Sequence, residues 1–115
     1  MNTHRSIPVF VILSLVLIAC ASNPVQTGQG RKLAFDRNKG NCLACHVIAD
    51  GESPGNIGPP LQALSKRFRD QQQLRDFIYD ARQNNPETSM PPFGANHILT
   101  DDELQQVVDY LWDLP

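Results

Sequence analysis

Two cysteines and a histidine stand close together in the order Cys-x-x-Cys-His, at Cys42, Cys45 and His46. Residues at positions i, i+3 and i+4 lie on one face of a helical turn, so these three side chains can address one flat ligand. This spacing is typical of a site that attaches a c-type haem. The two thiols would form thioethers with the haem vinyl groups, and the imidazole of His46 would bind the iron.

Two other kinds of site use the same residue types. A zinc site needs two further Cys or His ligands at suitable spacing, and only His97 follows downstream of the motif. A redox-active Cys-x-x-Cys pair needs a thioredoxin-like βαβ setting, and no strand-like run of residues precedes Cys42. Haem attachment is therefore the favoured interpretation.

A second iron ligand is expected from Met90, the only methionine besides Met1. Pro91 and Pro92 restrict the backbone that carries it. A thioether bound opposite a histidine raises the reduction potential of the iron, which suits an electron carrier. Three alternatives stay open: Met90 fills a gap in the core, His97 is the ligand instead, or the sixth position is left free.

The segment Gly58-Pro59-Pro60-Leu61 begins twelve residues after His46. A ligating histidine needs an acceptor for its other ring nitrogen, which fixes the orientation of the ring. The carbonyl of Pro59 is the candidate acceptor, because proline keeps its carbonyl while its ring restricts the backbone. A plain turn before a helix is the alternative.

These residues must be positioned by helices, because no segment has a convincing strand pattern. Helices are expected over residues 29–38, 61–68 and 70–83. A final helix is expected to begin at a capping box formed by Thr100 and Glu103 and to end at about Trp112. Residues 47–60 and 87–98 are rich in glycine and proline and are expected to be loops. The predicted fold class is all-α.

The N-terminal segment indicates export. Arg5 and the apolar run over residues 7–18 are typical of a signal peptide, and the run is too short to span a bilayer. Leu17-Ile18-Ala19-Cys20 resembles a bacterial lipobox, in which the cysteine is lipidated and becomes the first residue. Ala19-Cys20-Ala21 also fits ordinary signal cleavage. Lipidation is favoured because haem attachment uses only two of the three cysteines and leaves Cys20 as an odd thiol in an oxidising compartment.

The expected organisation is a signal peptide over residues 1–19, a tether over residues 20–28 and one small domain over residues 29–115. We expect a periplasmic protein anchored by lipid on Cys20. Ala21, which is not aspartate, favours the outer membrane, and a soluble periplasmic form is the alternative. The net charge of −2 and the lack of a basic patch argue against binding to nucleic acid.

The chain resembles the class I cytochromes c. The resemblance rests on Gly30, the Cys42-to-His46 motif, Gly58-Pro59-x-Leu61, Met90 and Val107-x-x-Tyr110-Leu111. In that family the first and last helices cross beside a covalent haem, and a glycine of the first helix meets an aromatic residue of the last. The resemblance implies that Gly30 meets Tyr110.

The match is closer to the SoxX family, the small monohaem subunits of the sulfur-oxidising Sox system. It extends over about residues 30–114, and its most specific part is Asn85-Pro86-x-Thr88-x-Met90-Pro91-Pro92-Phe93-Gly94. The resemblance implies a heterodimer with a SoxA-like haem protein, acting as an L-cysteine S-thiosulfotransferase on a SoxYZ-like carrier. The SoxX haem would pass electrons to a downstream acceptor. A lipobox departs from this mostly soluble family.

Two competing functions share the same ligands. A free-standing monohaem cytochrome c would shuttle electrons between membrane complexes and would need no partner haem subunit. A sensor of gas or small ligands would need an open sixth position on the iron, which Met90 argues against. The residues around Met90 favour the Sox electron-transfer subunit.

Overall fold

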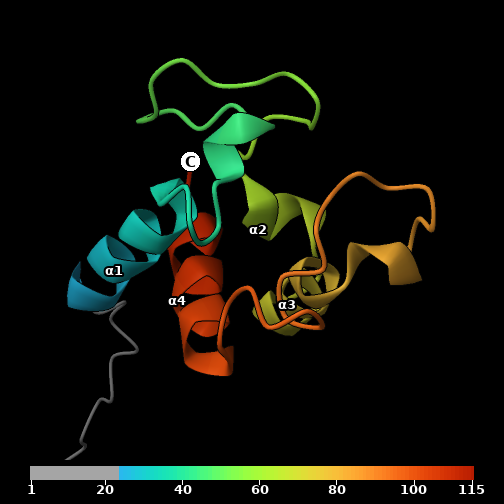
Figure 1. The fold of residues 1–115 in the computed structure, drawn as a ribbon. Helices are drawn as coiled ribbons and strands as arrows, with labels where there is room; N and C mark the ends of the chain where they lie inside the picture. The colour runs from blue at the N-terminus through green and yellow to red at the C-terminus, as the bar shows by residue number, and fades with distance from the viewer. Residues whose placement is uncertain (1–23) are drawn as a thin grey trace, which may run out of the picture.

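The structure is a computed structural model that describes residues 24–115 (Figure 1). In order along the chain, its elements are α1 (Pro24–Phe35), η1 (Cys42–Ala44), α2 (Leu64–Arg67), α3 (Gln71–Tyr79), η2 (Ala81–Gln83) and α4 (Asp101–Trp112). The described residues contain helices, turns and loops and no strand. This confirms the predicted all-α class for that part of the chain.

The first and last helices, α1 and α4, lie side by side (Figure 1). Gly30 makes their close approach possible. A Cβ atom built at Gly30 would collide with the backbone of Gln106 and would lie 2.8 Å from Cβ of Tyr110. The expected contact between Gly30 and Tyr110 is therefore present.

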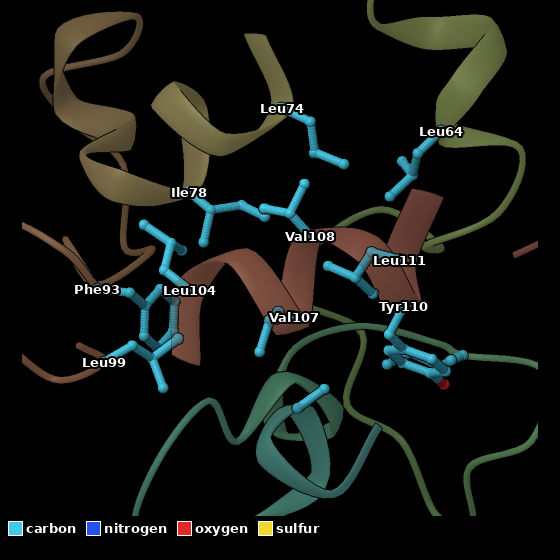
Figure 2. Close-up of a cluster of buried hydrophobic side chains, with 12 residues drawn as sticks. Leu64, Leu74, Ile78, Phe93, Leu99, Leu104, Val107, Val108, Tyr110 and Leu111 are labelled. Carbon is cyan, nitrogen blue, oxygen red and sulfur yellow. The ribbon is translucent and has the colours of Figure 1, made fainter. Parts of the chain in front are cut away.

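The last helix supplies most of the core. Thr100 and Glu103 form the predicted capping box at its start. Figure 2 shows its apolar side chains meeting side chains of α2, α3 and the loop before α4. The buried members from α4 are Leu104, Val107, Val108, Tyr110 and Leu111, and their partners include Leu64, Leu74, Ile78, Phe93 and Leu99. The i, i+3, i+4, i+7 spacing of these residues on α4 accounts for its buried face.

Several predicted helix boundaries are wrong. The first helix was predicted over residues 29–38, but α1 begins at Pro24 and ends at Phe35. Its start therefore lies within the segment that was expected to be a tether. The helix predicted over residues 61–68 is shortened to α2, which begins after Ala63, a residue with a left-handed φ of 47°. The predicted signal peptide and the predicted lipidation site Cys20 lie outside the described residues.

The helix predicted over residues 70–83 is broken at Asp80. Asp70 caps the start of α3 by accepting a hydrogen bond from the backbone nitrogen of Gln73. The backbone N–H of Asp80 closes the last turn of α3, and its carboxylate accepts from the backbone nitrogen of Arg82 to cap η2. Aspartate competes in this way with helix continuation, and apolar periodicity does not reveal it.

None of the helices within residues 24–115 is both long enough and apolar enough to span a membrane.

Candidate haem site

One cavity of about 610 Å³ brings the predicted haem residues together. Cys42, Cys45 and His46 line it from the segment that begins with η1. Met90 lines it from a loop more than forty residues later in the sequence. Its apolar wall comes from the helices, with Leu64, Phe68, Leu74, Phe77, Val107 and Leu111 among the lining residues. The volume lies within the range of about 300–1,000 Å³ typical of cofactor sites. The residues therefore fit a large, flat, apolar group with a metal at its centre.

The Cys-x-x-Cys-His motif is held in a single tight turn. Asn41 has a left-handed φ of 47° and precedes the short helix η1. The backbone nitrogens of Cys45 and His46 donate to the carbonyl oxygen of Cys42, at 3.2 and 2.9 Å. This turn keeps the two thiols and the imidazole together on one stretch of the cavity wall.

Cys42 and Cys45 are not joined to each other by a disulfide. Burial raises the pKa of the Cys42 thiol to about 11, and its neighbour Cys45 adds to the shift. A thiol with this pKa is protonated at neutral pH. A redox-active Cys-x-x-Cys pair uses a cysteine whose pKa is lowered, so the raised pKa of Cys42 argues against Cys42 as the reactive thiol of such a pair.

His46 is oriented by Pro59. Its Nδ1 atom lies 2.6 Å from the carbonyl oxygen of Pro59. The loop between them is held by backbone hydrogen bonds from Gly58 to the Cys45 carbonyl and from Leu61 to the Val47 carbonyl, both at 2.8 Å. The predicted contact between His46 and Pro59 is therefore present in the structure.

Met90 and His97, the two candidates for a second ligand, differ in position. Met90 is half-buried and lines the cavity, and its backbone nitrogen donates to Oγ1 of Thr88 at 3.2 Å. His97 is exposed, has a left-handed φ of 53° and is not among the cavity-lining residues. The position of His97 therefore favours Met90 as the ligand.

A hydrogen-bond network that was not predicted from the sequence connects the loop after the Cys-x-x-Cys-His motif to α1 and α4. The carboxylate of Asp50 accepts from the guanidinium of Arg31 on α1 and from the hydroxyl of Tyr110 on α4, the latter at 2.9 Å. The guanidinium of Arg31 also lies 4.4 Å above the centre of the Phe35 ring. The hydrogen bond from Arg31 holds the pKa of Asp50 below its ordinary value. An aspartate early in a glycine-rich loop was the only signal available in the sequence.

Within residues 24–115, no group of three or more His, Cys, Asp or Glu side chains is arranged to hold a metal ion directly. The described residues thus offer the zinc alternative no set of protein ligands.

The family model described as cytochrome c matches residues 29–115. A protein from Aquifex aeolicus named as an uncharacterized lipoprotein is 36% identical over 80 residues, which cover 65% of this chain. The chain spans only 37% of the length of that relative.

Among solved structures, the fold is similar to a chain in the crystal structure of SoxXA from P. pantotrophus. The TM-score is 0.68 and the sequence identity is 28%, over 76% of this chain and 80% of that chain. This similarity confirms the predicted resemblance to a cytochrome of the Sox system.

Proposed function

Because the chain belongs to the cytochrome c family, we propose that it binds one covalent haem c and transfers electrons as the small haem subunit of a SoxXA-type complex. Cys42 and Cys45 would hold the haem through thioethers, and His46 and Met90 would bind the iron. When bound, the haem supplies one-electron redox chemistry. The observation that carries the proposal is the convergence of these four side chains on one cavity.

The chain's own residues give the site the properties of an electron carrier. Pro59 holds the imidazole of His46 in one orientation, and Met90 is carried on a loop stiffened by Pro91 and Pro92. His46 and Met90 would both bind the iron of the proposed haem, which would leave no place there for substrate. The apolar wall of the cavity would shield the haem from water, and burial of this kind is one of the features that set a haem potential.

The partner must supply the reactive sulfur of the proposed reaction. Joining thiosulfate to a carrier cysteine forms a sulfur–sulfur bond and releases two electrons, and enzyme catalysis of this step requires a nucleophilic thiolate or persulfide. Cys42 and Cys45 become thioethers in the proposed site, and Cys20 is lipidated or lost with the signal peptide. The SoxA-like subunit would therefore form the bond on the SoxYZ-like carrier, and this chain would pass the electrons to a downstream acceptor.

A thiosulfate oxidation assay tests this division of labour. The haem-loaded subunit should show no turnover alone, and activity should appear when a SoxA-like partner and a carrier are added. Turnover by the isolated subunit would contradict the proposal. A mixture no more active than the partner alone would favour the free-standing monohaem cytochrome, as would the failure of a second haem protein to copurify.

We also propose that the protein is anchored to a periplasmic membrane surface, with the outer membrane favoured, through lipid on Cys20. The lipobox Leu17-Ile18-Ala19-Cys20 and a relative that is named as a lipoprotein support this location. Two acyl signals suffice for stable anchoring. Intact mass spectrometry should find a lipidated N-terminal Cys20, and Cys20→Ser should release the protein from sedimented membranes. A mature chain that starts at Ser22 without lipid would rule out the anchor.

A further inference from the structure

The backbone just after Met90 forms a compact turn that is closed by its own hydrogen bonds. The nitrogens of Asn96, His97 and Leu99 donate to the carbonyl oxygens of Pro92, Gly94 and Phe93, at distances between 2.9 and 3.0 Å. Phe93 is buried and lines the cavity. The turn therefore moves as a unit, and Met90 is attached to it through two prolines.

This turn is fastened to the end of α3 at one residue. The backbone nitrogens of Gly94 and Ala95 both donate to the carbonyl oxygen of Tyr79, each at 3.1 Å. Tyr79 is the last residue of α3, and carbonyl groups in the last turn of a helix lack partners within the helix. The methionine loop thus caps the helix that supplies Leu74 and Phe77 to the cavity wall.

Gly94 is buried where no other residue would fit. A Cβ atom at this position would lie 2.5 Å from Cε2 and 2.6 Å from Cγ of Tyr79, and closer still to Cδ2. The φ of Gly94 is not positive, so glycine is required for space and not for backbone conformation. Tyr79 as a residue is 38% exposed, so its ring covers the loop backbone without being part of the buried core.

We propose that Tyr79 and Gly94 are positioning residues that hold the sulfur of Met90 at the iron. Three residues separate Met90 from Gly94, and two of them, Pro91 and Pro92, have nearly fixed φ angles. A shift of Gly94 away from the Tyr79 ring is therefore passed on to Met90 and not absorbed along the way. The inference rests on the proposed ligation of iron by Met90.

Competition by an external ligand measures how firmly the sulfur is held. Imidazole binds ferric haem only when Met90 has left the iron, so its apparent affinity rises with the fraction of molecules in which the sixth position is open. Gly94→Ala should increase the imidazole affinity of the haem-loaded protein by about tenfold. The near-infrared sulfur-to-iron band should disappear at correspondingly lower imidazole concentrations.

Matched variants separate positioning from a general loss of stability. Gly28→Ala introduces the same methyl group where no atom lies within 4 Å, and it should leave the imidazole affinity unchanged. Tyr79→Ala alone should raise the imidazole affinity less than Gly94→Ala does, because it removes the contact without a clash. In the Gly94→Ala background it removes the ring that the methyl group meets, and it should lower the affinity to that of Tyr79→Ala alone. An effect of the double variant that is smaller than the sum of the two single effects is the coupling expected of two residues in contact. Tyr79→Phe keeps the ring and should behave like the wild type.

The outcomes distinguish this inference from the proposed function. If Met90→Ala abolishes the sulfur-to-iron band but Gly94→Ala binds imidazole like the wild type, Met90 is the ligand and the positioning role is wrong. If Met90→Ala leaves the band unchanged, the proposed ligation and the positioning role both fail. Should Gly94→Ala not retain haem, Tyr79→Ala alone provides the test. It removes the contact without a clash, and an unchanged imidazole affinity would overturn the inference.

Discussion

Nδ1 of His46 lies 2.6 Å from the carbonyl oxygen of Pro59. A carbonyl oxygen only accepts, so Nδ1 carries the proton and Nε2 keeps the lone pair that a metal needs. Gly58 stands directly against the same ring, because a Cβ atom there would lie 2.5 Å from Nδ1 and 2.8 Å from Nε2. The orientation of the ring therefore depends on both the Pro59 carbonyl and the missing side chain of Gly58.

The first prediction concerns Gly58→Ala, which should raise the reduction potential of the haem-loaded protein. The added methyl group forces the ring and the Pro59 carbonyl apart, and a weaker hydrogen bond makes the imidazole less basic and less able to stabilise ferric iron. For a one-electron couple, a tenfold change in relative affinity for the two oxidation states is about 59 mV. Potentiometric titration measures the shift, with Gly28→Ala as the control. An unchanged or lowered potential would show that this contact does not tune the iron.

The second prediction concerns the sulfur ligand. The ferric protein should show a weak near-infrared band from sulfur-to-iron charge transfer, and Met90→Ala should abolish the band and lower the potential. His97→Ala should leave the spectrum unchanged, because His97 is exposed and outside the cavity lining. A band that survives Met90→Ala, or a spectrum altered only by His97→Ala, would assign the ligand elsewhere.

The third prediction concerns the contact between α1 and α4. Gly30→Ala places a methyl group against the Gln106 backbone and 2.8 Å from Cβ of Tyr110, and it should lower the free energy of unfolding by about 1–3 kcal/mol. Gly28→Ala lies in the same helix with nothing within 4 Å, and it should raise that free energy by about 0.5–1 kcal/mol. Urea unfolding of both variants gives the comparison. Equal effects of the two substitutions would contradict the close approach.

The fourth prediction concerns the pH dependence of stability at Asp80. Hydrogen bonds from the Arg82 side chain lower the pKa of Asp80 from 3.8 to about 2 in the folded protein. Because the folded-state pKa is lower, the ionised carboxylate stabilises the fold above pH 3.8, and this contribution is lost as the pH falls toward 2. The excess stability of the wild type over Asp80→Asn in urea should shrink across this window. Arg82→Gln should weaken the same pH dependence, because it removes the side-chain hydrogen bonds and keeps the one from the backbone nitrogen. A difference that stays constant down to pH 2 would refute the assignment.

The features of the structure that follow from local or periodic patterns of residues were predictable from the sequence. The apolar spacing and capping box of α4 gave its position, and the spacing of Cys42, Cys45 and His46 placed them together. The contact between Gly30 and Tyr110 came only from the resemblance to class I cytochromes c. Local patterns carry this information because helices are built from contacts between near neighbours.

The remaining features depend on tertiary contacts that leave no periodic trace. The break at Asp80 arises because its carboxylate caps η2, although the apolar pattern continues through Ala81. The hydrogen bond between Asp50 and Tyr110 joins residues that are 60 positions apart. Gly94 looks like an ordinary loop glycine until the ring of Tyr79 is placed against it.

The meeting of α1 and α4 also affects the speed of folding. Gly30 and Tyr110 are about 80 residues apart, and closing a loop of that length costs roughly 4 kcal/mol of chain entropy. Contacts between such distant residues slow folding relative to helical proteins built from local contacts. Until α4 docks, the cavity lacks the wall formed by Val107 and Leu111. Bringing the two ends of the domain together therefore costs more chain entropy than closing the shorter haem-binding loops between them.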